Sequence, residues 1–208
     1  DPLQLLFWAG ALLTAITVHE FAHAYSADRL GDPTPRVQGR LTLNPLAHLD
    51  PIGTLALLLV GFGWGKPVQF DPYNLENPRR DAAIISFAGP LSNILLAAAL
   101  AGTFYIMTAL GLITLSTLPI FTPFIYLNVL LAVFNLVPIH PLDGGKILVG
   151  LLPSEEARSL DSFLKQYGML ILLFLILPIF QGRPLVFFLI GPSISFLLNL
   201  LLPGPRLI

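Results

Sequence analysis

Two histidines and a glutamate stand at metal-site spacing near the end of the first apolar run of the chain. In the stretch "TAITVHEFAHAYSADRL", His19 and His23 are four residues apart and Glu20 directly follows His19. A helical repeat of 3.6 residues places both imidazoles on one face, where they can bind one Zn²⁺. Glu20 then lies beside the metal, where a base for an activated water belongs. This spacing favours a metal site over two core histidines with a snorkelling glutamate.

Two histidines and a water leave a tetrahedral zinc one protein ligand short. The imidazoles and aspartates near membrane-inserted sequence are His48, Asp50, His140 and Asp143. Asp143 is the best placed, because Pro138 and Pro141 interrupt a helix before it and a Gly-Gly pair opens a new helical run after it. Non-helical backbone at membrane depth must line a cavity in the protein or a water-filled one. An N-cap aspartate is the commoner role for such a residue alone, but the histidine pair favours ligation.

The composition sets the surroundings of this site. Apolar residues make up 55% of the 208 residues and charged residues 11%, and the mean hydropathy is +0.78, which indicates an integral membrane protein in a lipid bilayer. The net charge of -1 excludes the basic footprint of nucleic-acid binding. Because the chain has no cysteine, any metal must be held by His, Asp or Glu.

Hydropathy predicts an all-α polytopic membrane protein of about five transmembrane helices, in a single domain over residues 1–208. The predicted spans are 3–27, 82–112, 120–137, 167–180 and 185–202, the last broken at Gly191-Pro192. Residues 51–64 have too few apolar residues to cross, so we interpret them as re-entrant or interfacial. The site is expected between the first helix and a broken third helix.

The stretch "GFGWGKPVQF" at 61–70 alternates glycine with aromatic residues before a proline. Such a period of two predicts a short edge strand or β-hairpin, which could bind an extended substrate by strand addition. Gly63, Trp64 and Val68 are the candidate substrate contacts in it. An interfacial loop that only anchors Trp64 at the headgroups is the equal alternative.

Orientation follows from the basic residues. If the first span enters from outside, all eleven lysines and arginines except Arg183 lie on the cytoplasmic side. The same arrangement places the residues from His19 to His23 at the cytoplasmic end of the first helix.

Three motifs carry a family resemblance over nearly the entire chain. HEFAH in the first span, "FAGPLSN" at 87–93 and "NLVPIHPLDGG" at 135–145 resemble the site-2 proteases, which are intramembrane zinc metalloproteases. The resemblance implies hydrolysis of peptide bonds in or near transmembrane segments of membrane-anchored substrates. It also implies a multi-pass protein of a bacterial-type cell membrane, with its active site toward the cytoplasmic side. The form expected is a minimal one, without a PDZ or nucleotide-sensing domain. An oligomer is compatible with the sequence.

The resemblance also implies roles for individual residues. One zinc per chain is expected on His19, His23 and Asp143, with Glu20 as general base. Asn135 is expected to stabilise the oxyanion or position substrate.

Two further polar residues in these motifs have weaker implied roles. Asn93 closes the Gly-Pro-x-x-Asn motif and is expected to support helix packing or bind the mobile stretch, with a structural role favoured over a catalytic one; it is also a candidate substrate-binding residue. His140 stands where the family commonly has proline. We interpret it as a polar residue that lines the substrate cavity, with roles as a ligand or as a partner of a ligand left open, because three residues of extended chain point it away from Asp143.

Two other functions use similar residues. A metal- or proton-coupled transporter would distribute ionisable residues over several helices, whereas the predicted spans 82–112 and 185–202 carry no Asp, Glu, His, Lys or Arg. A catalytically inactive membrane scaffold would be expected to show a damaged motif, whereas His19, Glu20, His23 and Asp143 are all present.

Overall fold

The structure is a computed structural model that describes residues 2–60, 63–178 and 182–202. Within these ranges the chain is helical and contains no β-sheet. The four helical segments long and apolar enough to cross a membrane are α1 (Pro2–Arg29), α4 (Pro78–Ala109), α5 (Leu118–Asn135) with the preceding 3₁₀ turn η3 (Leu115–Thr117), and α7 (Ser154–Ile176). The chain is therefore an integral membrane protein, as its composition predicts.

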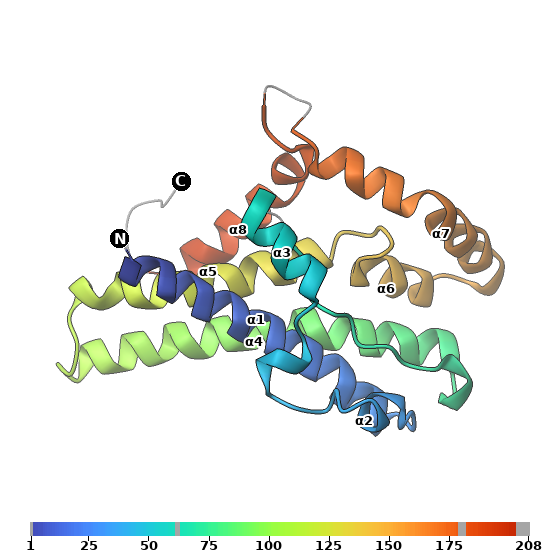
Figure 1. Cartoon of the computed structure of the whole chain (residues 1–208), viewed down its shortest axis with the longest axis horizontal. Coiled ribbons are helices and arrows are strands. Elements are labelled where there is room, and N and C mark those ends of the chain that lie inside the picture. The colour runs from blue at the N-terminus through green and yellow to red at the C-terminus, as the bar shows by residue number, and fades with distance from the viewer. Residues whose placement is uncertain (1, 61–62, 179–181, 203–208) are drawn as a thin grey trace.

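Shorter elements connect and follow these helices. Those between α1 and α4 are α2 (Thr34–Val37), η1 (Pro45–Ala47), α3 (Pro51–Val60) and η2 (Pro72–Asn74). The others are α6 (Asp143–Leu151), between α5 and α7, and the apolar 17-residue α8 (Leu185–Leu201). Figure 1 shows α1, α4 and α5 running side by side, and α6 lies against the end of α4 that begins at Pro78.

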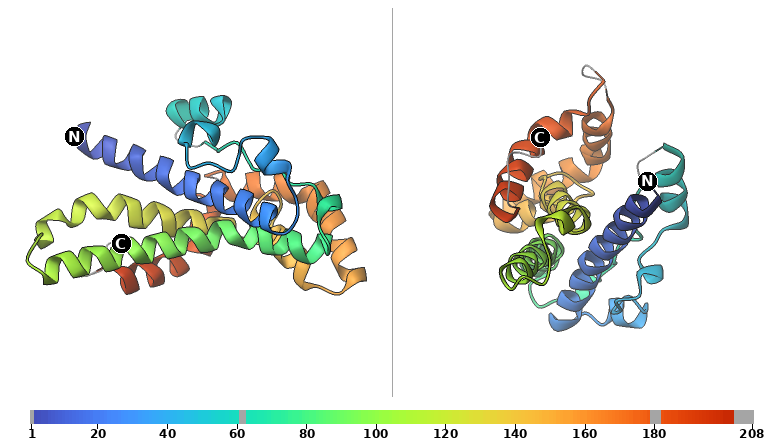
Figure 2. Two further views of the ribbon diagram at one scale, coloured as in Figure 1. Left: turned by 90° about the horizontal axis from the view of Figure 1, so that it is seen from below. Right: turned by 90° about the vertical axis from the view of Figure 1, so that its left-hand side faces the viewer.

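Helix α4 is the centre of the bundle, because it contacts α1, α5, α6 and α8. Both views of Figure 2 keep α1, α4 and α5 together. The helices approach closely through small residues, since lipid tails provide no hydrophobic drive for their association. The buried alanines of the described helices are Ala11, Ala15, Ala24 and Ala27 on α1, Ala97 and Ala101 on α4, Ala132 on α5 and Ala157 on α7. Larger side chains of α5 and α8, such as Val129 and Ile190, complete the core.

The structure differs from the prediction at two places in the last two helices. Helix α7 begins at Ser154, thirteen residues before the predicted span, because hydropathy marks only its apolar half while two glutamates in its first turn complement the helix dipole. The predicted break at Gly191-Pro192 is absent, and α8 continues through it. Pro192 lacks the N–H that would bond the Phe188 carbonyl one turn back, and membrane-spanning helices tolerate such a loss.

The segment predicted as re-entrant or hairpin is a short helix followed by extended chain. With ten residues, α3 rises about 15 Å, half of a hydrocarbon core, so it does not cross. Residues 63–70 form no strand, and the extended chain pairs through one isolated antiparallel bridge between Leu49 and Gly65. Gly61 and Phe62 lie outside the described residues. The β-hairpin is therefore not formed within residues 63–70, and re-entry and the fifth span stay predictions.

Candidate metal centre

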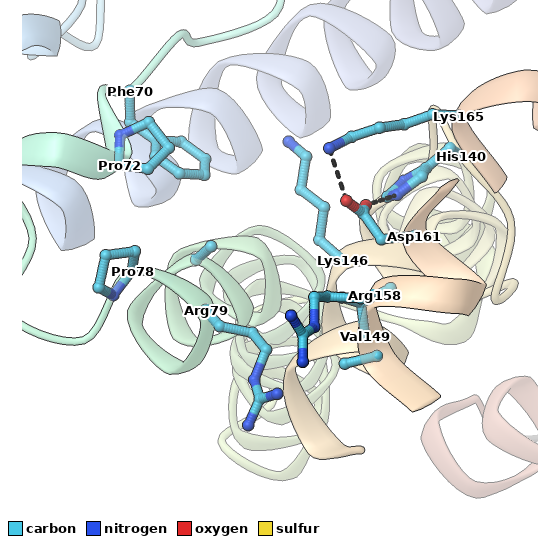
Figure 3. Close-up of a pocket in the computed structure, with 12 residues that line it drawn as sticks. Phe70, Pro72, Pro78, Arg79, His140, Lys146, Val149, Arg158, Asp161 and Lys165 are labelled. Atoms are coloured by element: carbon cyan, nitrogen blue, oxygen red, sulfur yellow. Dashed lines mark hydrogen bonds and ion pairs between the residues drawn. The ribbon is translucent and has the colours of Figure 1, made fainter. Parts of the chain in front are cut away.

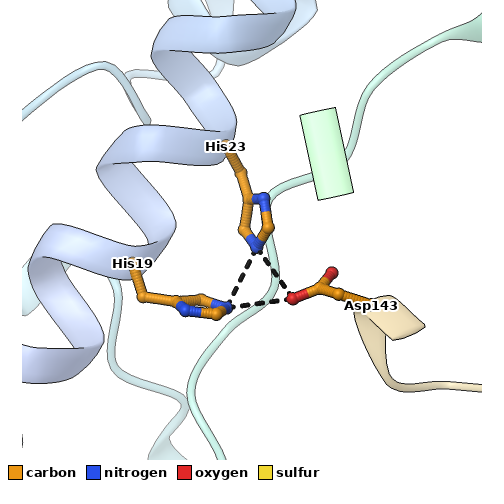
Figure 4. A group of neighbouring side chains, drawn as sticks. All are labelled: His19, His23 and Asp143. Atoms are coloured by element: carbon orange, nitrogen blue, oxygen red, sulfur yellow. Dashed lines mark hydrogen bonds and ion pairs between the residues drawn. The ribbon is translucent and has the colours of Figure 1, made fainter. Parts of the chain in front are cut away.

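Three side chains from two helices meet at one point (Figure 4). His19 and His23 share a face of α1, and Asp143 is the first residue of α6. The Nε2 atoms of the two histidines are 3.0 Å apart, and Asp143 Oδ2 lies 3.1 Å from that of His19 and 3.2 Å from that of His23. All three residues are buried. The three predicted ligands thus come together across 124 residues of sequence.

The hydrogen bonds made by Nδ1 of each imidazole determine which ring nitrogen carries the lone pair. His23 Nδ1 lies 2.7 Å from the Ile85 carbonyl oxygen, and His19 Nδ1 lies 2.6 Å from Asn93 Oδ1. Both oxygens can only accept, so each Nδ1 donates and each neutral ring keeps its lone pair at Nε2. Two lone pairs and a carboxylate oxygen therefore face one another.

This donor set fits a zinc ion. A tetrahedral zinc with bonds of about 2.0–2.1 Å to nitrogen and oxygen has ligand atoms about 3.3 Å apart, which is close to the three distances observed. Three acceptors at this spacing repel one another, and a cation between them removes the repulsion. Two imidazoles and a carboxylate leave the fourth position for water or substrate, as catalytic zinc sites require.

A pair of asparagines fixes the orientation of His19. The Asn93 amide nitrogen donates to the Ala15 carbonyl at 3.0 Å and to Asn128 Oδ1 at 2.7 Å, so its oxygen must face His19. Asn128 in turn donates to the Phe124 carbonyl at 2.8 Å. This chain of hydrogen bonds ties α1, α4 and α5 together around the ligand. Sequence reasoning missed Asn128, although an asparagine inside an apolar spanning helix is itself a sign of function.

Glycines allow the helices to pack closely around the site. A Cβ atom on Gly89 would lie 2.5 Å from the His23 ring and 2.7 Å from His19 Cε1. A Cβ atom on Gly144 would lie 2.4 Å from the carbonyl oxygens of Leu136 and Val137, against which the start of α6 packs. Side chains at either position would displace the ligands, which explains the glycines in both motifs.

Glu20 stands apart from the three ligands. Its Oε2 accepts the backbone N–H of Val68 at 2.8 Å, so the extended segment reaches the predicted base. Arg40, which is buried, donates to the carbonyls of Ala47 and Lys66 and fixes the same segment from the other side. Burial lowers the pKa of the Arg40 guanidinium, and the nearby Glu20 carboxylate opposes that shift. Sequence reasoning missed Arg40, whose partners are backbone carbonyls that no motif marks.

Other candidate residues lie away from the ligands. Asn135 donates its amide to the Leu131 carbonyl at 3.0 Å, one turn back in α5, and His140 Nε2 lies 3.1 Å from Asp161 Oδ1 on α7. His48 Nε2 donates to the Thr42 carbonyl at 2.8 Å.

The remaining candidate residues make contacts within the segment between α2 and α4. Asp50 accepts the Gly53 N–H at 2.8 Å and caps α3. Gly63 is partly buried and Trp64 is half-exposed, and the Trp64 backbone packs on Gly53. Of the three predicted contacts in the extended segment, Val68 is the one bonded to Glu20.

The protein is a helical membrane protein with a buried His₂Asp cluster and an adjacent glutamate. This arrangement is typical of a membrane-embedded metallohydrolase. A family model described as Peptidase family M50 matches residues 100–179. "Putative zinc metalloprotease YwhC" of Bacillus subtilis (strain 168) is 39% identical over 180 residues, which cover 84% of this chain and 82% of that protein. Rip2 of Mycolicibacterium smegmatis, which carries the same description, is 34% identical over 191 residues, covering 85% and 71%. No solved structure matches.

The chain belongs to peptidase family M50, the site-2 protease family. It is an intramembrane zinc metalloprotease, and zinc is its cofactor. The family and the intact cluster do not favour the transporter or the inactive scaffold.

Proposed function

We propose that His19, His23 and Asp143 hold one zinc ion per chain and that Glu20 is the general base for hydrolysis of membrane-anchored clients. The observation that carries this assignment is the convergence of two Nε2 lone pairs and one carboxylate oxygen within 3.2 Å. Glu20 extends from the same helix without joining the cluster, which leaves it free to take a proton.

The residues of the chain divide the reaction between them. When bound, zinc supplies Lewis-acid polarisation of the scissile carbonyl and lowers the pKa of water. Glu20 accepts a proton from the attacking water and delivers it to the departing amine. Asn135 is the proposed donor to the developing oxyanion or to the substrate, after its amide leaves the Leu131 carbonyl. Asn93 keeps His19 in the ligating tautomer.

The client must be extended before it is cut, because a helix engages its carbonyls in i to i−4 hydrogen bonds. We propose that residues 63–70 receive the unwound client by strand addition, with Gly63, Trp64 and Val68 in contact with it. The support is that this segment is extended and pairs with the protein through a single bridge, while Val68 places it beside Glu20.

We further propose that α8 is a fifth span, since its 17 residues rise about 25 Å. The site then faces the cytoplasm of a bacterial-type cell membrane, which the distribution of lysine and arginine supports. The proposed partners are membrane-anchored protein substrates.

Metal analysis of the protein in lipid vesicles tests the ligand set. Asp143→Ala should lose stoichiometric zinc, whereas His140→Ala should keep it, because His140 lies against Asp161. The opposite pattern would reassign the third ligand.

The same vesicles test the extended segment with a single-span peptide as client. Gln69→Pro, which removes one backbone donor, should slow cleavage and leave zinc in place. Cleavage at the parental rate would reduce the segment to a membrane anchor.

A further inference from the structure

A cavity lined by basic side chains lies between α4, α6 and α7 (Figure 3). Its volume is about 410 Å³. Arg79 comes from the first turn of α4, Lys146 from α6, and Arg158 and Lys165 from α7. Basic residues from three helices thus line one cavity: in Figure 3 the Lys146 and Lys165 side chains extend to one end of it, and the Arg79 and Arg158 side chains to the other.

Among the described residues that line the cavity, Asp161 carries the single carboxylate, and this carboxylate already has partners. Asp161 lies 2.5 Å from Lys165 Nζ and 3.1 Å from His140 Nε2, as the dashed lines of Figure 3 show. Within the described residues no carboxylate forms an ion pair with Arg79, Lys146 or Arg158. The Lys146 ammonium instead lies 5.2 Å from the centre of the Phe70 ring. Three cations are therefore left without an anion, and such an excess attracts negative charge.

The basic cavity continues toward the catalytic groups. A second cavity of about 690 Å³ shares Lys146, Lys165 and His140 with it and is also lined by Val68 and Pro141. Val68 donates its N–H to Glu20, and Pro141 is two residues from Asp143. A chain lying along the extended segment can therefore reach the basic side chains.

We propose that the basic cavity binds an acidic segment of the client, namely aspartate or glutamate side chains that flank its membrane span. This inference rests on the proposed function and adds a substrate class to it. Lys146 and Arg79 supply the free positive charge, while Asp161 holds Lys165 and His140 in place. A client with acidic flanking residues is then anchored beside the site while its span unwinds. A lipid phosphate offers similar charge, but the continuity with the Glu20 segment favours the client.

The test uses the full-length protein in zwitterionic vesicles and two synthetic single-span peptides, one flanked by glutamates and the other by glutamines. The parent protein should show a lower KM for the glutamate peptide. The double variant Arg79→Gln/Lys146→Gln should reduce this preference about tenfold, since each exposed ion pair contributes modestly. Added salt should reduce it as well. Arg80→Gln is the matched control, because Arg80 is next to Arg79 in α4 but does not line the cavity.

A charge reversal separates recognition from loss of structure. Lys146→Glu should shift the preference toward a peptide flanked by lysines, which a merely damaged protein would not do. Equal KM values for the two peptides with the parent protein, or no change of preference in any variant, would overturn the proposal. So would an effect that follows the phosphatidylglycerol content of the vesicles equally for both peptides, because the cavity would then bind lipid.

Binding to the Glu20→Gln variant distinguishes this proposal from the proposed function. If this variant binds the glutamate peptide more tightly than the glutamine peptide, and this preference requires Arg79 and Lys146, the cavity proposal stands. It stands even if neither the parent protein nor any variant cleaves the peptides. If cleavage depends on Glu20 but binding ignores the flanking charge, the cavity proposal fails alone.

Discussion

The zinc-ligand cluster and the Glu20 contact start from neighbouring residues of α1 but are held by different kinds of group. The ligands are held by side chains inside the bundle: Asn93 and Asn128 orient His19, and Asp143 arrives on α6. Glu20 is held by the backbone of a loop outside the spanning helices, through Val68 N–H, and Arg40 fixes that loop through carbonyls. Changes near the ligands should therefore alter metal binding, whereas changes in the loop should alter turnover with the metal in place.

Glu20→Gln should give the largest effect and should act on turnover alone. We expect cleavage to fall about 10²- to 10⁴-fold, because the amide can still accept the Val68 N–H but cannot take a proton from water. Zinc content should stay at that of the parent protein, as metal analysis can check. Glu76→Gln, an exposed glutamate of the same loop region, is the control. Turnover close to the parental rate would remove Glu20 from the mechanism.

Asn93→Leu should act on the metal. Without its oxygen, His19 loses the acceptor that fixes its tautomer, and zinc affinity should fall about 10- to 100-fold in competition with a chelator. Asn128→Leu should have a smaller effect, because it acts through Asn93. Asn199→Leu on α8 is exposed and serves as the control. Unchanged affinity in Asn93→Leu would mean that the bundle alone orients the ligand.

Arg40→Gln should lower kcat about tenfold and leave zinc binding unchanged, because small misplacements of a catalytic group are costly. The side chain fixes the segment that carries the Val68 donor, so Glu20 loses its support. Arg36→Gln, which breaks an exposed ion pair with Asp28, should change kcat little. A loss of zinc in Arg40→Gln would contradict the division between side-chain and backbone support.

Asp32→Asn should have the smallest effect on turnover and should act on stability. Burial would raise the pKa of Asp32, but hydrogen bonds from Thr34, Asn74 and the Asp71 N–H outweigh it and hold the pKa below its usual range. The carboxylate therefore stabilises the fold above the unfolded pKa of about 4, and this stability is lost as pH falls through the lower, folded pKa.

The measurement for Asp32 is the difference in Tm between the parent and Asp32→Asn. The substitution should cost about 1–3 kcal/mol near neutral pH, and the difference should narrow as the pH falls from 6 to 3. Asp28→Asn should show a smaller difference, because its partner Arg36 is exposed. A difference that does not vary with pH would show that the Asp32 charge does not matter.

The sequence by itself determined the class of protein, four long apolar helices and the candidate ligands. Hydropathy is a local property, so runs of apolar residues predict helices without knowledge of their neighbours. The spacing of His19 and His23 is likewise local, because one helical turn joins them. Asp143 could be proposed because few residues in an apolar chain can bind a metal.

Only the tertiary structure decided how these residues are supported. The Asn93–Asn128 pair, the Arg40 contacts and the Val68 bond to Glu20 join residues 7 to 48 positions apart, mostly through backbone groups that every residue type carries. Such contacts leave no pattern in the sequence. The predicted hairpin illustrates the same limit. Its alternating residues favour a strand, but a strand also needs a partner, and residues 63–70 pair with the rest of the chain through a single bridge.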